Sequence, residues 1–260
     1  MWVLLLISAS AMAQNVQITA HRGASGYAPE NTLSSVKKAL EIGVDRIEVD
    51  VQQTSDGVVV LLHDKTLDRT TDSKGKVGKM TWNELKGVHA YDKFEAEFPK
   101  EPIPTLEQVF ELMDGSTEFV IEIKAGNRTY PGIEDNVVAL IRKYKAEKWA
   151  LVHSFNDRVL KHIHKHHPDI RLQKLFVSYS GGMMLDFKLH ATKLSKYDYV
   201  EGFGISLSGT NKKLVDKIHS IGMIVHVWTV NKEEDMQKML DLGVDGLISN
   251  YPDRVKKLIR

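Results

Sequence analysis

Two carboxylates two positions apart, Glu48 and Asp50, lie within an apolar segment that has the composition of a β-strand. Successive side chains of a strand point to opposite faces, so both carboxylates are predicted to share one face. Ile47, Val49 and Val51 take the other face. A buried pair of like charges is unfavourable unless a cation neutralises it. The pattern therefore predicts a metal site on this strand.

A third carboxylate and a lysine occur in the same spacing further along the chain. Glu122 and Lys124 lie two apart near the end of the apolar segment 118–125, so they too share a face. Carboxylates are hard oxygen ligands, and a site with three of them favours Mg²⁺ or Ca²⁺ over Zn²⁺. Lys124 beside them suits an anion held against the metal. We therefore expect one divalent metal, Ca²⁺ or Mg²⁺, near a bound anion.

Histidines end two other apolar segments. His21 follows the segment 16–20 and precedes Arg22, and His63 ends the segment 58–63. His153 and Phe155 share one face of a later strand, which brings His153 within reach of the same site. Histidine titrates near neutral pH, so it suits proton transfer.

Other candidate residues have plainer explanations. Trp228 ends a late apolar segment and is expected to flank a substrate, whereas His226 on the same face is interpreted as a core histidine. His162 and His166 are four apart on a predicted helix, a spacing that binds metals weakly. We interpret that helix face as solvated and polar.

Strand-like and helical segments alternate along most of the chain. The predicted strands are 16–20, 46–54, 58–63, 118–125, 150–155, 171–178, 199–206, 224–230 and 244–249. The predicted helices are 33–43, 105–115, 132–148, 156–168, 211–222, 232–243 and 251–260. Glycines end several of these helices, as is typical of C-caps. Strands of this kind fit a parallel sheet covered by helices.

About eight strand–helix steps within 260 residues favour an α/β fold, a closed (β/α)8 TIM barrel. An open doubly wound sheet is the alternative, but no GxGxxG fingerprint follows a strand. In such a barrel, chemistry is placed at the C-terminal ends of the strands, where the candidate residues lie. The polar, turn-rich segment 64–104 is predicted to be an insertion over one end of the barrel, with a short helix at 82–85. Residues 181–196 are expected to form an irregular connector.

Composition limits the classes of partner that the protein is expected to bind. The net charge of +1 gives no reason to expect binding to nucleic acid or to an anionic membrane surface. The chain has no cysteine, which excludes disulfides and thiolate metal sites. We expect a small-molecule substrate and no stable membrane anchor. Composition and sequence pattern do not predict the oligomeric state.

The first thirteen residues have the pattern of a secretory signal. An apolar segment at 2–7 precedes Ala11-Met12-Ala13, a small-x-small cleavage site before Gln14. The apolar segment is too short to span a bilayer. We therefore predict a signal peptide at 1–13, a mature domain at 14–260, and export to the periplasm or beyond.

The ordered motifs resemble the glycerophosphodiester phosphodiesterase family. They are HRG (21–23), PENT (29–32), the E-x-D strand, HD (63–64), LDRTT (67–71), EIK (122–124), WTVN (228–231) and DGLISNYPD (245–253). The resemblance covers nearly all of Ile18 to Leu258, and the motifs occur in the family's order.

This resemblance implies a (β/α)8 barrel that binds one divalent metal, often Ca²⁺ or Mg²⁺. By matching positions, Glu48, Asp50 and Glu122 are the metal ligands, and His21 and His63 are the acid–base pair. Arg22 and Lys124 hold phosphate oxygens, with Trp228 and His153 as further substrate-binding candidates.

The implied reaction is hydrolysis of glycerophosphodiesters to glycerol 3-phosphate and an alcohol. A lipid-directed phospholipase C or D on the same barrel, and a non-catalytic binding barrel, are the alternatives.

Overall fold

The computed structural model describes residues 16–90, 94, 97–98, 101–177 and 193–259. The predicted signal peptide and most of the predicted connector at 181–196 lie outside these residues. The last part of that connector includes the short 3-10 helix η2 (Leu194–Tyr197).

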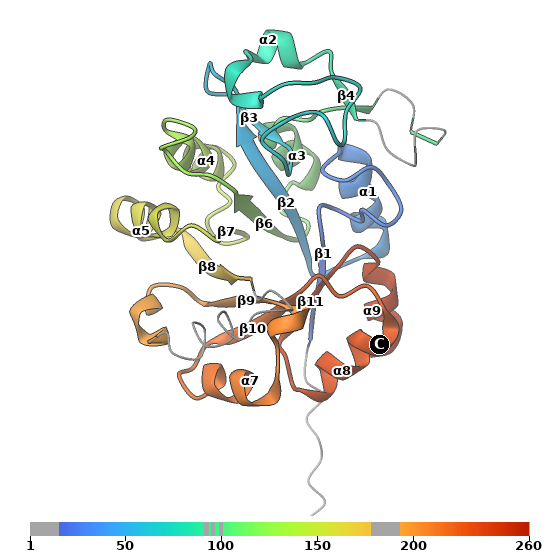
Figure 1. Cartoon of the computed structure of the whole chain (residues 1–260), viewed down its shortest axis with the longest axis vertical. Coiled ribbons are helices and arrows are strands. Elements are labelled where there is room, and N and C mark those ends of the chain that lie inside the picture. The colour runs from blue at the N-terminus through green and yellow to red at the C-terminus, as the bar shows by residue number, and fades with distance from the viewer. Residues whose placement is uncertain (1–15, 91–93, 95–96, 99–100, 178–192, 260) are drawn as a thin grey trace, which may run out of the picture.

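A closed barrel of eight parallel strands forms the centre of the described chain (Figure 1). The strands run in the order β1, β11, β10, β9, β8, β7, β6, β2, and pairing of β1 with β2 closes the ring. They are β1 (Gln17–Ala20), β2 (Arg46–Gln53), β6 (Glu118–Ile123), β7 (Ala150–Ser154), β8 (Arg171–Phe176), β9 (Gly202–Ser206), β10 (Ile224–Trp228) and β11 (Gly246–Ser249). The predicted (β/α)8 architecture is confirmed.

Helices surround the barrel (Figure 1). They are α1 (Leu33–Ile42), α3 (Leu106–Met113), α4 (Ile133–Lys143), α5 (Asp157–His166), α7 (Lys212–His219), α8 (Glu233–Asp241) and α9 (Pro252–Ile259). α1 shows how local sequence sets their limits. The Thr32 side chain accepts a hydrogen bond from the Ser35 N–H at its start, and Gly43 ends it in a left-handed conformation with φ of 71°.

One predicted strand does not belong to the barrel. The apolar segment 58–63 contains β3 (Val59–Leu61), which pairs antiparallel with β2 after a tight turn. A short turn permits only an antiparallel return, whereas a parallel neighbour needs a longer crossover. β3 therefore extends the sheet beyond the barrel and leads the chain into the segment 64–104.

The segment 64–104 has short elements and a small hydrophobic core of its own. It contains η1 (Val77–Lys79), α2 (Trp82–Leu85), β4 (His89–Ala90) and β5 (Glu101–Pro102). Its core joins residues of β3 to residues of the segment: Val60, Leu62, Leu67, Val77, Leu85, Val88 and Ile103. Figure 1 shows it beyond the C-terminal end of β2. The predicted short helix at 82–85 coincides with α2.

The two faces of the barrel strands differ in polarity. On β2 the apolar Ile47, Val49 and Val51 belong to the large hydrophobic core, whereas Glu48 and Asp50 are buried polar residues. The parallel register aligns Asp50 with Glu122 of β6, and Glu122 with His153 of β7. Because laterally paired residues point to the same face of a sheet, this register gathers ionisable groups inside the barrel.

A second polar layer lies deeper in the barrel. Arg46 contacts Glu118, with 2.7 Å between Nε and Oε2, and its Nη1 lies 2.6 Å from Nδ1 of His226. The amide of Gln173 also donates to this Nδ1. Two donors on one ring nitrogen require that nitrogen to be unprotonated, and burial lowers the pKa of His226. His226 is thus a core histidine, as predicted.

Among the described residues, no helix is both long and apolar enough to cross a membrane.

Candidate active site

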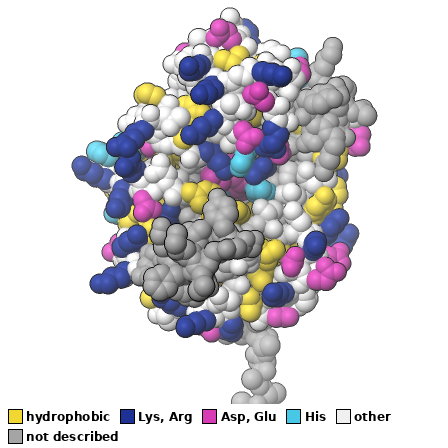
Figure 2. Space-filling view, viewed as in Figure 1, with side chains coloured by type: hydrophobic (Ala, Val, Ile, Leu, Met, Phe, Trp, Pro, Cys, Tyr) yellow, Lys and Arg dark blue, Asp and Glu magenta, His cyan; other side chains and the backbone are white. Residues whose placement is uncertain are grey.

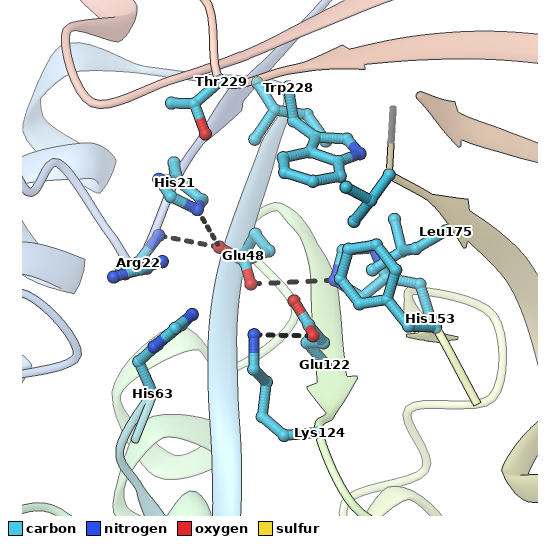
Figure 3. A pocket seen from close by; sticks show the side chains of 13 residues that line it. His21, Arg22, Glu48, His63, Glu122, Lys124, His153, Leu175, Trp228 and Thr229 are labelled. Carbon is cyan, nitrogen blue, oxygen red and sulfur yellow. Dashed lines mark hydrogen bonds and ion pairs between the residues drawn. The ribbon is translucent and has the colours of Figure 1, made fainter. Parts of the chain in front are cut away.

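A cavity of about 320 Å³ opens at the C-terminal ends of the barrel strands. Figure 3 shows histidine, carboxylate and cationic side chains pointing into it from several strands and from the segments that follow strand ends. Its lining consists of His21, Arg22, Glu48, His63, Glu122, Lys124, His153, Phe155, Leu175, Val177, Trp228, Thr229 and Ile248. Residues far apart in the sequence therefore meet in one pocket, as the strand-end rule predicts.

Glu48, Glu122 and His153 form a buried group at the base of the cavity. One potential ligand atom of each lies within 4.8 Å of the others, and His153 Nε2 is 3.7 Å from Glu48 Oε1. All three residues are at most 6% exposed. Glu48 Oε1 and both ring nitrogens of His153 have no hydrogen-bond partner among the described residues. Buried acceptors left without donors fit a bound cation.

Burial controls the protonation of this group. Burial, with the nearby charge of Asp50, raises the pKa of Glu48 and of Glu122 to about 7. Burial lowers the pKa of His153 to about 4, so its imidazole is neutral at neutral pH. A divalent cation reverses the penalty on the carboxylates because it stabilises their charged form.

Asp50 lies beside this group but does not line the cavity. Its Oδ2 accepts a hydrogen bond from Asn31 Nδ2 and lies 3.2 Å from Arg22 Nε. Its Oδ1 lies 3.3 Å from Lys124 Nζ, a nitrogen that also contacts Glu122 at 2.8 Å. Burial raises the pKa of Asp50, but Lys124 and Arg22 outweigh burial and hold this pKa below its ordinary value. Its predicted role as a metal ligand stays a prediction.

His21 and His63 line the same cavity, and each has an oxygen partner at Nδ1. Asn250 Oδ1 lies 2.7 Å from Nδ1 of His21, and Asp64 Oδ1 lies 2.7 Å from Nδ1 of His63. In both rings this leaves Nε2 as the nitrogen free to exchange a proton with a substrate. Burial lowers both pKa values, partly offset by Glu48 at His21 and by Asp50 at His63.

The chain bends sharply after His21. Arg22 has φ of 55° and Gly23 has φ of 72°. A Cβ on Gly23 would lie 2.4 Å from Ser35 Oγ, so glycine is needed here. The bend directs the Arg22 N–H to Glu48 Oε2 at 2.8 Å, while its guanidinium contacts Glu30 and Asp50. Adjacent His21 and Arg22 can therefore both line the cavity.

Aromatic side chains form one wall. Trp228 packs edge-to-face on Phe155, with ring centroids 5.3 Å apart. Lys124 Nζ lies 5.8 Å from the Phe155 ring centroid. Trp228 thus lines the cavity, and its predicted role of flanking a substrate stays a prediction.

Sequence reasoning did not predict several residues that hold the site residues in place. Asn250 and Asp64 hold the two histidines, and Asn31 holds Asp50. Arg69 pairs with Asp64 at the edge of the site. Asp64 directly follows His63 and Asn250 directly follows the last barrel strand, which are signals for placing both at the site. Arg69 lies within the LDRTT motif at 67–71, but its distance from His63 in the sequence gives no sign of its contact with Asp64.

The histidines of α5 do not line this cavity. His162 and His167 contact Asp135 of α4 at 3.0 and 2.9 Å, and these three form a second group with metal-binding spacing. The ring centroids of His162 and His166 are 4.7 Å apart. The partner of His162 is therefore an acidic residue of the neighbouring helix.

A (β/α)8 barrel with carboxylates, histidines and cationic side chains in a cavity at the C-terminal ends of its strands has the architecture of the TIM-barrel enzymes. The model of the glycerophosphoryl diester phosphodiesterase family matches residues 21–254, and the chain belongs to this family.

Individual relatives are similar over almost the whole chain. A glycerophosphodiester phosphodiesterase of Caldanaerobacter subterraneus subsp. tengcongensis is 38% identical over 94% of this chain and 97% of its own. Another, from Bacillus subtilis, is 34% identical over 92% of this chain and 85% of its own. A phosphodiesterase of Oleispira antarctica, solved in complex with the product sn-glycerol-3-phosphate, has a TM-score of 0.79 and 30% identity, covering 94% and 96% of the two chains.

Proposed function

We propose that this protein hydrolyses glycerophosphodiesters, such as deacylated phospholipids, to glycerol 3-phosphate and an alcohol. The observation that carries the proposal is the shared cavity, in which His21 and His63 face the Glu48–Glu122 carboxylates and two cationic side chains. Family membership and the product complex of the Oleispira antarctica relative support it.

We infer that one divalent cation binds at the base of the cavity. The group formed by Glu48, Glu122 and His153 fits a cation because Glu48 Oε1 and both ring nitrogens of His153 have no hydrogen-bond partner among the described residues. Glu122 and Asp50 add buried carboxylates beside them. The carboxylate oxygens favour Ca²⁺ or Mg²⁺. When bound, the cation supplies Lewis-acid stabilisation of charge that develops on the phosphoryl oxygens.

Arg22 and Lys124 are proposed to hold the phosphate. Both line the cavity, and in the described residues both are paired with carboxylates. With Glu122 holding a cation, the ammonium of Lys124 would be available to the phosphate. Together the two side chains orient the diester and neutralise its charge.

We propose that the two histidines transfer protons in succession. One neutral imidazole takes a proton from the attacking oxygen, and the other, protonated, gives one to the leaving alcohol. In the route we favour, the glycerol 2-hydroxyl attacks phosphorus and the bond to the alcohol breaks. Water then attacks phosphorus, the bond from phosphorus to the 2-oxygen breaks, and the 2-oxygen takes up a proton to give glycerol 3-phosphate.

Analogues without the 2-hydroxyl test this two-step route. They should not be turned over, although they should still inhibit competitively, because the cavity still binds their phosphate. Normal turnover of such analogues would show that water attacks directly.

The overall function is tested with a panel of glycerophospho-alcohols assayed with Ca²⁺, with Mg²⁺ and with chelator. Hydrolysis that depends on the metal supports the proposal, whereas hydrolysis unaffected by the chelator argues against the metal. Intact phospholipid vesicles form a second arm, because a lipid-directed phospholipase would cleave those instead.

We further propose that the protein is exported after cleavage between Ala13 and Gln14. The apolar segment at 2–7 and the small residues before the cleavage site support this. Exported protein should begin at Gln14 on N-terminal sequencing, whereas cytosolic protein that retains Met1 would contradict it.

A further inference from the structure

A second cavity, of about 390 Å³, adjoins the proposed active site. Both cavities are lined by Lys124, which therefore stands between them. The second cavity is bounded by Lys65, by Arg128 in the loop between β6 and α4, and by Arg158 near the start of α5. A substrate whose phosphate is held at Lys124 can extend from the first cavity into the second.

Three cationic side chains of this second cavity differ in their ion pairing from the cationic side chains nearer the active site. Arg22, Arg69 and Lys124 each pair with carboxylates. Lys65, Arg128 and Arg158 take part in no ion pair within the part of the chain that the structure describes. Figure 2 shows Lys and Arg side chains gathered beside the central acidic and histidine side chains.

One carboxylate also lines the second cavity, but it serves the loop. Glu134 is 2% exposed; its Oε1 accepts the backbone N–H of Asn127, whereas its Oε2 has no hydrogen-bond partner among the described residues. Three cationic side chains against this single carboxylate leave an excess of positive charge. A cavity with such an excess attracts an anion.

The chemistry of the proposed substrate determines which half of it carries the anionic group that the second cavity attracts. The scissile phosphate belongs to the first cavity, beside the carboxylates and histidines. The glycerol half of a glycerophosphodiester has no further charge, so an additional anionic group must lie on the alcohol half.

We propose that the second cavity binds a second phosphate on the alcohol half of the substrate. The preferred substrates are then glycerophosphodiesters whose alcohol is itself phosphorylated. This inference rests on the proposed function and names its substrate class.

A pair of substrates that differ by one phosphate tests the proposal. We compare kcat/KM for glycerophosphoglycerol and for glycerophosphoglycerol phosphate, with glycerophosphocholine as a substrate of opposite head-group charge. The phosphorylated substrate should be preferred by about tenfold, since each partly exposed ionic contact contributes modestly. The preference should weaken as ionic strength rises.

The variant Arg128→Ser/Arg158→Ser should reduce the preference to about twofold or less, while glycerophosphocholine is turned over as in the wild type. Lys161→Ser removes a charge from the exposed side of the same helix α5 and serves as the matched control. It should keep the full preference. Equal turnover of the matched substrates by the wild type, or an unchanged preference in the double variant, overturns the inference.

Two further measurements separate this inference from the proposed function and from binding to a lipid surface. If no glycerophosphodiester is hydrolysed, the proposed function fails, and calorimetric binding of glycerol bisphosphate to wild type and double variant decides the inference alone. Binding that the double variant loses supports it, and equal binding contradicts it. A double variant that binds anionic vesicles more weakly than the wild type, together with a wild type that shows no preference for the phosphorylated substrate, would assign these cations to a lipid surface. That outcome would overturn the substrate site.

Discussion

Glu48 contacts more of the proposed catalytic and metal-binding residues than the other residues of β2 do. Its Oε2 accepts the Arg22 N–H at 2.8 Å and lies 4.0 Å from His21 Nε2. Its Oε1 faces His153. One buried carboxylate thus fixes the bend after β1, adjoins a proposed acid–base histidine and contributes to the proposed metal site. At the residue scale, its charge and its shape can be tested separately.

Glu48→Gln preserves the acceptor for Arg22 but removes the negative charge. We predict that metal binding is lost and kcat falls by about 10²-fold or more, because charge stabilisation at phosphorus is lost. The thermal midpoint of the metal-free protein should be equal or higher, which excludes unfolding as the cause. Turnover within a few-fold of wild type, with no effect of chelator on either protein, would contradict the proposed site.

His153→Ala separates two roles for this histidine. If His153 binds the metal, metal affinity should weaken by about 10- to 100-fold while KM at saturating metal stays near the wild-type value. Calorimetric metal titration and steady-state kinetics measure the two quantities. His164→Ala on α5 is the control, because that ring stacks on Tyr199. A raised KM with unchanged metal affinity would assign His153 to the substrate, as the sequence predicted.

At the scale of elements, the barrel interior depends on small residues opposite large ones. Gly246 of β11 is paired with His226 of β10, and a Cβ there would lie 2.4 Å from His226 Cδ2 and 3.0 Å from the Gln17 carbonyl oxygen. His226 is held by Arg46 and Gln173, so it has little freedom to move. The deeper polar layer supports the strands on which the cavity is built.

Gly246→Ala should therefore destabilise the protein by about 1–3 kcal/mol, as overpacking of a core does. Gly87→Ala is the matched control, since no atom lies within 4 Å of the added Cβ and no left-handed backbone is involved. It should change the free energy of unfolding by less than about 0.5 kcal/mol. Denaturant unfolding measures both, and equal effects would show that the contact at His226 is easily relieved.

The sequence predicts elements better than it predicts contacts. Alternating segments and strand-end polar residues were sufficient for the barrel and for placing His21, Glu48 and Glu122 in one cavity. Apolar composition does not give the direction of β3, but the three residues between the predicted strands 46–54 and 58–63 permit only an antiparallel return, so this direction was open to prediction. The pairing of Asp50 with Asn31, and of His21 with Asn250, depends on side-chain positions that form only when distant segments pack.

At the scale of the whole molecule, stability and metal binding are linked through the buried carboxyls. The pKa of Glu48 and of Glu122 is raised from 4.5 to about 7 in the fold. Their contribution to stability is therefore fully present below pH 4.5 and is lost as pH rises through about 7. His153, with its lowered pKa, contributes stability that is present above pH 6.5 and lost as pH falls through about 4.

Between pH 6.5 and 8 we therefore predict that the metal-free wild type loses stability as pH rises. Glu122→Gln should lose less, and saturating Ca²⁺ or Mg²⁺ should reverse the slope for the wild type because the metal binds the deprotonated carboxylates. Thermal midpoints with chelator and with metal measure this. If the thermal midpoints of wild type and variant change in parallel with pH, Glu122 is not responsible for the loss of stability.

A crystal structure with Mn²⁺ and glycerol 3-phosphate, analysed by anomalous scattering, tests the central claim most directly, because it locates the metal and the phosphate together. We predict one anomalous peak within bonding distance of Glu48 and Glu122, with the phosphate between that peak and the Nε2 atoms of His21 and His63. A metal bound away from both carboxylates, or a phosphate out of reach of both histidines, would contradict the account.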